Sequence, residues 1–156
     1  MLPLEPMQRV RYGGATMNVR TRDMVKYAES LAGFKFQIAQ GSYNTGVGAS
    51  AGTHDGGGVI DFRTRHLSTA DRIKMVRALK DAGFAAWFRP EIAGLWGPHV
   101  HACAFGDPEM AAGAKQQLAS FDRGRNGLKG DALDNTYRPE PKVGWNYKAG
   151  KPRTRR

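Results

Sequence analysis

Two short histidine-containing segments hold the residues of this chain that are best suited to chemistry. In the first segment, His54 and Asp61 stand seven residues apart, with three consecutive glycines between them. In the second, His99 and His101 are separated by a single residue. Two imidazoles and one carboxylate form a ligand set that suits Zn²⁺, and three protein ligands leave the fourth tetrahedral position open for water. The pattern therefore predicts a catalytic zinc site formed by His54, Asp61 and a histidine of the second segment.

The chemistry of such a site would be hydrolysis. A divalent cation lowers the pKa of bound water to about 7 and polarises a carbonyl group. Glycines after His54 allow the tight turn that lets a loop residue and a residue of the following strand point at one ion. Taken singly, these residues are more often turn residues or hydrogen-bonded imidazoles than ligands. The prediction therefore rests on the occurrence of both segments in this order.

Three segments around these residues are predicted to be strands. Residues 59–62 and 84–88 are short, apolar runs typical of buried strands. Residues 99–105 alternate so that both histidines and Cys103 share one face of the strand. Cys103 is the only cysteine, so no internal disulfide can form, and we interpret it as a buried thiol. The sequence thus predicts that the histidines project from a sheet.

Three further segments are predicted to be helices, and they lie over 21–33, 68–83 and 107–121. The first two have apolar side chains at helical spacing and end at a glycine, with Thr21 and either Ser68 or Thr69 as possible caps. The third begins with an Asp-Pro pair, which is typical of helix starts. Residues 9–20 are predicted to form a hairpin or edge strand, and residues 34–40 a strand. This order indicates an α+β fold, with a small antiparallel sheet flanked by about three helices.

Length and composition predict one globular domain with a basic tail. The chain has 156 residues, of which 40% are hydrophobic, and this is enough for a single core. We assign residues 1–125 to the domain. Residues 126–156 are rich in Gly, Pro, Lys and Arg and contain no acidic residue from Lys142 onward. We expect this tail to be partly disordered, and we expect the protein to be a monomer.

The formal net charge of +10 predicts attraction to polyanions such as anionic wall polymers, membrane surfaces or nucleic acid. The basic residues are not interleaved with aromatic residues in the manner of nucleic-acid stacking motifs, so we expect no specific nucleic-acid binding. The first twelve residues mix charged and apolar side chains, unlike a secretory signal peptide. We therefore expect synthesis in a host cytoplasm without a signal peptide.

The first segment, THDGGGVID from Thr53 to Asp61, resembles the H-x-x-G-x-A-x-D element of zinc peptidases of the D-alanyl-D-alanine carboxypeptidase type. The second segment resembles the H-x-H element that these enzymes share with lysostaphin-type peptidases and the hedgehog signalling domain. The resemblance spans about residues 36–105. It implies a zinc ion held by His54, Asp61 and His101 on an antiparallel sheet, with His99 beside the metal as an acid–base or transition-state residue.

Departures from the family pattern leave the identity of the general base open. Family members usually carry a serine two residues before the first ligand, where this chain has Gly52. Carboxypeptidase-type members place a catalytic glutamate three residues before the last ligand, where this chain has Pro98. Either His99 takes the proton, or Glu91 reaches in from the preceding loop. We favour His99, because two-residue spacing on a strand fixes it beside His101.

The resemblance implies a zinc-dependent peptidase that cuts stem peptides or cross-links of bacterial peptidoglycan. Phage endolysins are well represented in this group, so the expectation is a phage or prophage enzyme acting at the cell wall, with a host wall-remodelling enzyme as the alternative origin. The alternative function is a non-catalytic zinc-containing module that binds cell wall or protein.

The glycine-rich loop before the first ligand is expected to form one wall of the substrate cleft. The side chains expected to contact substrate are those of Gln40, Ser42, Tyr43 and Asn44. Arg89 is interpreted as a solvated surface arginine, with pairing to a substrate carboxylate as the alternative.

Overall fold

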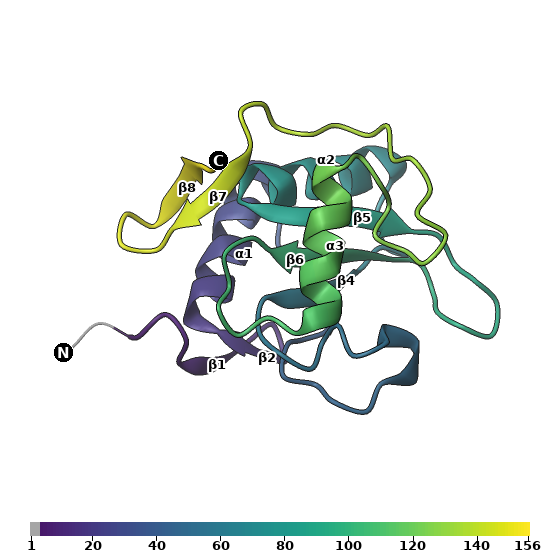
Figure 1. Ribbon diagram of the computed structural model, residues 1–156, viewed down its shortest axis with the longest axis horizontal. Helices are drawn as coiled ribbons and strands as arrows, with labels where there is room; N and C mark the ends of the chain where they lie inside the picture. Colours follow the sequence, from purple (N-terminus) through teal and green to yellow (C-terminus); the bar gives the residue numbers. More distant parts are fainter. Residues whose placement is uncertain (1–3) are drawn as a thin grey trace.

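The computed structural model describes residues 4–156 and confirms the α+β class (Figure 1). Its central element is a four-stranded antiparallel sheet of order β3-β4-β6-β5. The strands are β3 (Ile38–Gln40), β4 (Val59–Arg63), β5 (Phe84–Arg89) and β6 (His99–Ala104). The predictions for the three longer strands are thus confirmed.

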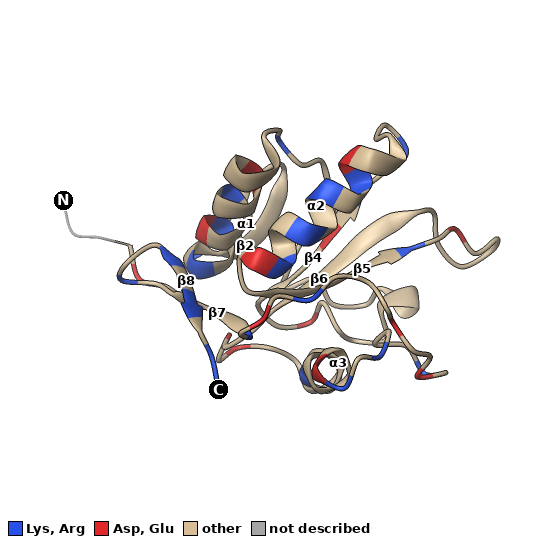
Figure 2. Cartoon of the chain, turned by 90° about the horizontal axis from the view of Figure 1, so that it is seen from above, with Lys and Arg blue, Asp and Glu red and all other residues tan. Residues whose placement is uncertain are grey.

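Helices cover both faces of this sheet (Figure 2). Helices α1 (Val19–Ala32) and α2 (Thr69–Asp81) lie on one face, and α3 (Ala112–Asp122) lies on the other. Within the described residues, no helix is both long and apolar enough to span a bilayer.

Side-chain alternation along the strands divides the core into two parts. The larger part packs between the sheet and α1 and α2, and from β4 it includes Ile60 and Phe62. The smaller part lies under α3 and includes Val59, Trp87 and Cys103. Because successive side chains of a strand point to opposite faces, the predicted metal ligands lie on the α3 side.

The helix ends differ in part from the predicted ones. Asn18, not Thr21, caps α1, since its side chain accepts a hydrogen bond from the Thr21 amide at 2.8 Å. Ser68 caps α2 as expected. Helix α3 begins at Ala112 and not at Asp107, whose carboxylate instead accepts a hydrogen bond from Asn18 Nδ2 at 2.7 Å. Asp107 therefore links the start of α1 to the loop before α3.

A hairpin precedes α1 in the chain, and a short strand follows it. The predicted hairpin is present as β1 (Arg9–Tyr12) and β2 (Ala15–Asn18), paired antiparallel. The strand expected over 34–40 is shorter, because the Phe36 amide donates to the Glu29 carboxylate of α1 at 2.8 Å instead of entering the sheet ladder.

The C-terminal segment is part of the fold, where the sequence led us to expect partial disorder. Strands β7 (Val143–Asn146) and β8 (Lys151–Thr154) form an antiparallel hairpin. Trp145 is only 4% exposed and joins the larger core. Its ring packs edge-on against Tyr27 of α1, with 5.5 Å between ring centroids. One large aromatic side chain thus anchors a segment whose overall composition is that of a solvated tail.

Replacing Trp145 with alanine is expected to lower the free energy of unfolding by about 3–5 kcal/mol, because it leaves a cavity in the core. Chemical denaturation would measure this loss. Lys148→Ala, at an exposed position of the same hairpin, is the matched control and should change stability by less than about 0.5 kcal/mol. A loss near the control value for Trp145→Ala would mean that the hairpin is not part of the cooperative fold.

Candidate metal centre

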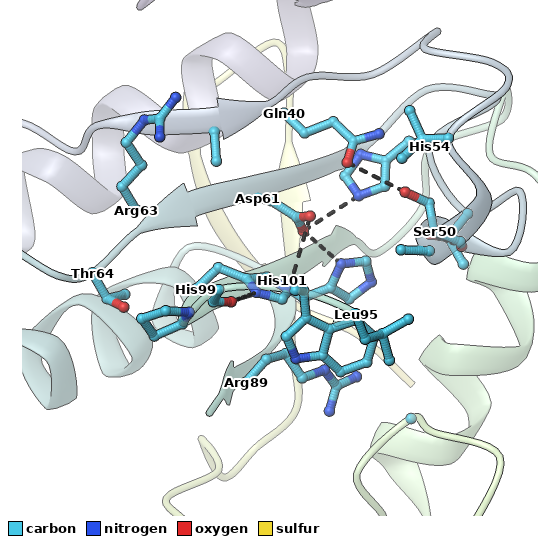
Figure 3. A pocket seen from close by; sticks show the side chains of 18 of the residues that line it. Gln40, Ser50, His54, Asp61, Arg63, Thr64, Arg89, Leu95, His99 and His101 are labelled. Atoms are coloured by element: carbon cyan, nitrogen blue, oxygen red, sulfur yellow. Dashed lines mark hydrogen bonds and ion pairs between the residues drawn. The ribbon is translucent and has the colours of Figure 1, made fainter. Parts of the chain in front are cut away.

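The predicted ligands lie at a cavity of about 710 Å³ on the α3 side of the sheet (Figure 3). All four strands of the sheet contribute residues to its lining. Its walls come from the loop before β4, the loop between β5 and β6, Gln117 of α3 and residues 127–129. Segments distant along the chain therefore meet around one space.

The structure brings His54, Asp61 and His101 together. Asp61 Oδ1 lies 2.7 Å from His101 Nδ1 and 3.3 Å from His54 Nε2. The three ligand atoms all lie within 4.8 Å of one another, and both histidines are buried. Two imidazole nitrogens and a carboxylate oxygen at this separation could hold a metal ion.

Strand pairing positions two of these ligands. Asp61 of β4 and His101 of β6 are direct cross-strand partners, and side chains at paired positions lie about 4.5–5.5 Å apart at Cβ. His54 comes instead from the loop, where its Nδ1 lies 2.9 Å from the Gly41 carbonyl. That hydrogen bond fixes the ring so that Nε2 faces Asp61 Oδ1.

The glycines after His54 are required for close backbone approach. A Cβ atom at Gly56 would lie 2.2 Å from the Glu109 carbonyl oxygen, which also accepts a hydrogen bond from the Gly57 amide at 2.9 Å. Gly58 has a φ of 80°, a conformation that side chains other than glycine rarely adopt. The loop that carries His54 is thus held against the segment before α3.

The charges of the three groups are coupled. Burial raises the pKa of the Asp61 carboxyl, but hydrogen bonds from His101 and His54 outweigh burial and hold this pKa well below its usual range. Burial lowers the pKa of His101, but the neighbouring Cys103 and the Asp61 carboxylate outweigh it and raise this pKa to about 10. The carboxylate therefore attracts positive charge to the point where the three donor atoms converge.

The far side of the His101 ring contacts a residue that the sequence analysis missed. His101 Nε2 lies 2.7 Å from Gln117 Oε1, and the Gln117 amide nitrogen donates to the Gly127 carbonyl at 3.1 Å. The bond to Gly127 fixes the amide so that its oxygen accepts from His101. Nδ1 of His101 is thereby oriented toward Asp61. Helical spacing from buried Ala114 could have indicated that Gln117 faces inward, but nothing in the sequence relates it to His101.

Replacing Gln117 with alanine is expected to weaken metal binding by about 10–100-fold, since the hydrogen bond that orients a ligand histidine would be lost. Competition with a chelator would measure the change. Gln116→Ala, at an exposed neighbouring position, is the matched control and should leave affinity unchanged. Gln117→Glu keeps an oxygen acceptor and should retain most of the affinity. Wild-type affinity in Gln117→Ala would exclude an orienting role.

His99 lies beside the three ligands without joining them. Its Nε2 is 3.9 Å from Asp61 Oδ2, and its Nδ1 is 2.9 Å from the Gly97 carbonyl. The bond to Gly97 requires the proton on Nδ1, so Nε2 is left as a free acceptor that lines the cavity. Burial lowers the pKa of His99, which favours the neutral ring. His99 therefore presents a basic nitrogen next to the candidate metal position.

Glu91, the alternative base, lies outside the cavity lining. Its carboxylate forms an exposed ion pair with Arg65. Asp61 is the only acidic residue among those that line the cavity. His99 is therefore the nearer of the two candidate bases.

Only one of the four predicted substrate contacts lines the cavity. Gln40 does so, and its Oε1 accepts from Ser50 Oγ at 3.2 Å. Ser42 is buried and donates to the Val59 carbonyl at 2.9 Å. Tyr43 contacts Asn18 and Glu109 through its hydroxyl. Asn44 is not part of the lining either. Its backbone N–H donates to the His54 carbonyl at 2.8 Å and so holds the loop. The last three stabilise the loop that carries the first ligand.

Arg89 is buried, and the interpretation of it as a solvated surface residue is wrong. It is 4% exposed, and its Nη1 donates to the Asn126 carbonyl. Burial lowers its pKa to about 10, so the guanidinium remains charged at neutral pH. Residues 126–129 fold over this part of the sheet, and their docking removes the arginine from solvent.

The function of this centre must be argued from its own geometry. Two imidazoles and a carboxylate converge beside a fourth, basic side chain in a cavity large enough for a peptide segment. No family model matches the chain, and no curated protein and no solved structure matches it.

Proposed function

We propose that the protein is a zinc-dependent peptidase of bacterial peptidoglycan, related to the D-alanyl-D-alanine carboxypeptidase and lysostaphin-type group. The observation that carries the proposal is the convergence of His54, Asp61 and His101 at a cavity that His99 also lines. The two sequence elements that resemble this group supply all four residues. The proposed substrates are stem peptides or cross-links of the wall.

The donor set supports zinc as the resident metal. Imidazole and carboxylate ligands suit Zn²⁺, and three protein ligands are the number found in catalytic zinc sites. His54 would bind through Nε2, His101 through Nδ1 and Asp61 through a carboxylate oxygen, as these atoms already face one another. When bound, the ion would supply polarisation of the scissile carbonyl and activation of water.

The protein residues would divide the remaining tasks. His99 Nε2 would accept the proton of the attacking water, because the Nδ1 proton is donated to the Gly97 carbonyl. After attack, the same nitrogen would deliver that proton to the leaving amine. Gln117 holds the His101 ring in place, and the cavity walls position the peptide beside His99.

Localisation at the wall is part of the proposal. The net charge of +10 supports attraction to anionic wall polymers. Figure 2 shows Lys and Arg positions along α2 and β8. A basic exterior of this kind would concentrate a small phage endolysin at the wall once the membrane is breached.

A second candidate function is a zinc-containing module without catalysis. It is favoured by the lack of any carboxylate base in the cavity lining, where the only acidic residue is the ligand Asp61. Such a module would bind wall or protein but would cut no bond. His99 argues against it, because a structural site has no need of a free basic nitrogen at an open cavity.

Purified peptidoglycan separates the two functions. Zinc-loaded protein should release new amine ends and soluble peptide fragments, and mass analysis of the fragments would identify the bond. Protein stripped with a chelator should release none, and added zinc should restore activity. Zinc-loaded protein that binds peptidoglycan without releasing amine ends would exclude the peptidase and support the binding module.

A further inference from the structure

The loop that follows α3 folds over the sheet beside the metal centre. Residues 124–134 form this loop, and its two arms are joined where the Asn126 N–H donates to the Ala132 carbonyl at 2.9 Å. Between the arms, residues 127–129 line the cavity. The 124–134 loop is therefore a closed unit that supplies part of one wall of the cavity.

Two side chains of β5 hold this loop on the sheet. The Trp87 indole N–H donates to the Arg125 carbonyl at 3.0 Å, and the Arg89 guanidinium donates to the Asn126 carbonyl. Trp87 and Arg89 are each only 4% exposed. A buried donor that loses its partner is costly to the fold, so these two bonds hold the loop in one docked position.

The next carbonyl along the loop, that of Gly127, connects it to the metal centre. This carbonyl accepts from Gln117 Nε2 at 3.1 Å, while Gln117 Oε1 lies 2.7 Å from His101 Nε2. Reversal of the amide would set its oxygen against the Gly127 carbonyl, so the loop keeps Oε1 turned toward His101. The proton of the His101 ring is thereby held on Nε2, and Nδ1 is free to bind a metal.

The position of the Gly127 carbonyl depends on the absence of a side chain. Gly127 has a φ of 73°, and a Cβ atom there would lie 2.9 Å from the Trp87 ring. Gly130, at the tip of the same loop, differs, because no described atom lies within 4 Å of its Cβ position. A side chain at position 127 should therefore displace the loop, whereas one at position 130 should not.

We propose that the 124–134 loop is a positioning element of the metal centre, and that metal binding and docking of this loop strengthen each other. The proposal rests on the metal centre of the proposed function but does not require catalysis. The loop acts on His101 only through Gln117. Because coupling between two sites is reciprocal, an ion bound to His101 in turn stabilises the docked loop. The shape of one cavity wall is thus tied to metal loading.

Zinc affinity, measured by competition with a chelator, tests the first half of the proposal. Gly127→Ala is expected to bind zinc about tenfold more weakly, at the low end of the effect of losing an outer hydrogen bond to a ligand histidine. Gly130→Ala is the matched control and should keep wild-type affinity. The unfolding midpoint of each metal-free variant is measured alongside, so that affinities are compared between folded proteins.

A double variant tests whether the loop acts through Gln117. Gln117→Ala removes the amide that joins the Gly127 carbonyl to the His101 ring. If this amide is the only connection, the double variant Gln117→Ala/Gly127→Ala should bind zinc no more weakly than Gln117→Ala alone. A purely structural effect of the loop would instead add to the loss.

Hydrogen exchange tests the second half of the proposal without any reaction. The Gly127 N–H donates to Ser120 Oγ of α3 at 3.0 Å, so its exchange reports undocking of the loop. Zinc should slow this exchange about tenfold relative to that of the Arg155 N–H, which donates to the Lys142 carbonyl in the C-terminal segment. In Gln117→Ala, zinc should no longer slow exchange at Gly127 relative to this reference.

The outcomes separate this proposal from the proposed function. Wild-type zinc affinity in Gly127→Ala, an equal loss in Gly130→Ala, or exchange at Gly127 that zinc leaves unchanged overturns the coupling while the metal centre stands. A further loss in the double variant overturns the route through Gln117. A wild type that binds no zinc overturns both proposals. Coupling without release of amine ends from peptidoglycan would sustain the positioning loop and overturn the peptidase.

Discussion

Replacing His101 with alanine is expected to abolish metal retention and peptide hydrolysis together. His101 supplies one of three donor atoms that lie within 4.8 Å of one another, and only His54 and Asp61 would remain. The loss of affinity should exceed the roughly 10–100-fold effect expected for the supporting residue Gln117. Metal content after dialysis and the count of released amine ends would measure the two losses in parallel.

His66→Ala is the matched control for metal retention. His66 is an exposed histidine of the same cavity lining, but it is not part of the three-residue group. The control should keep one metal ion per chain. If His101→Ala also kept its metal after dialysis, the ligand set would have to include a different side chain.

Replacing His99 with alanine is expected to keep the metal and to lower kcat by about 10²–10⁴-fold. The ring lies 3.9 Å from the free oxygen of Asp61 and holds its other nitrogen on Gly97, so its removal leaves the three ligands in place. Metal content and kcat, measured on the same preparation, separate this effect from a loss of zinc. A lower kcat at unchanged metal content would identify His99 as a catalytic residue, whereas loss of both would identify a ligand.

Glu91→Gln provides the comparison that decides the identity of the base. Glu91 is exposed, pairs with Arg65 and lies outside the cavity lining, so this change should leave kcat within about twofold of wild type. A large loss in Glu91→Gln together with full activity in His99→Ala would reverse the assignment. The loop between β5 and β6 would then have to move inward during the reaction.

The sequence predicted the parts of the site that depend on local backbone geometry. Alternation along 99–105 was sufficient to place both histidines and Cys103 on one face, because strand side chains repeat every two residues. Glycine spacing after His54 indicated a tight turn, which the positive φ of Gly58 confirms. Both conclusions concern residues that are close in the sequence, for which few backbone conformations are possible.

Residues brought to the site by packing between distant segments could not be predicted. Gln117 reaches His101 only because α3 docks on that face of the sheet, and helical periodicity does not specify the partner of an inward-facing side chain. Arg89 is buried only because residues 126–129 fold over it. Tyr43 was predicted to contact substrate from its loop composition, but its hydroxyl is drawn into contacts with Asn18 and Glu109.

Two differences in secondary structure have the same origin. The Asp-Pro pair before α3 resembles a helix start, yet Asp107 is engaged by Asn18 of another element and the helix begins five residues later. The C-terminal segment has the composition of a disordered tail, yet Trp145 packs in the larger core against Tyr27, a residue far away in the sequence. In each case one long-range contact outweighs the local signal.

The position of the single thiol provides an intrinsic reporter of motion at this centre. Cys103 is fully buried, and its sulfur lies 3.3 Å from Gln117 Oε1, beneath the inner surface of α3. An alkylating reagent can reach the sulfur only when this helix separates from the sheet, so the rate of labelling measures how often the two layers part. Because the chain has no other cysteine, that rate can be read in the unmodified protein, with no engineered label.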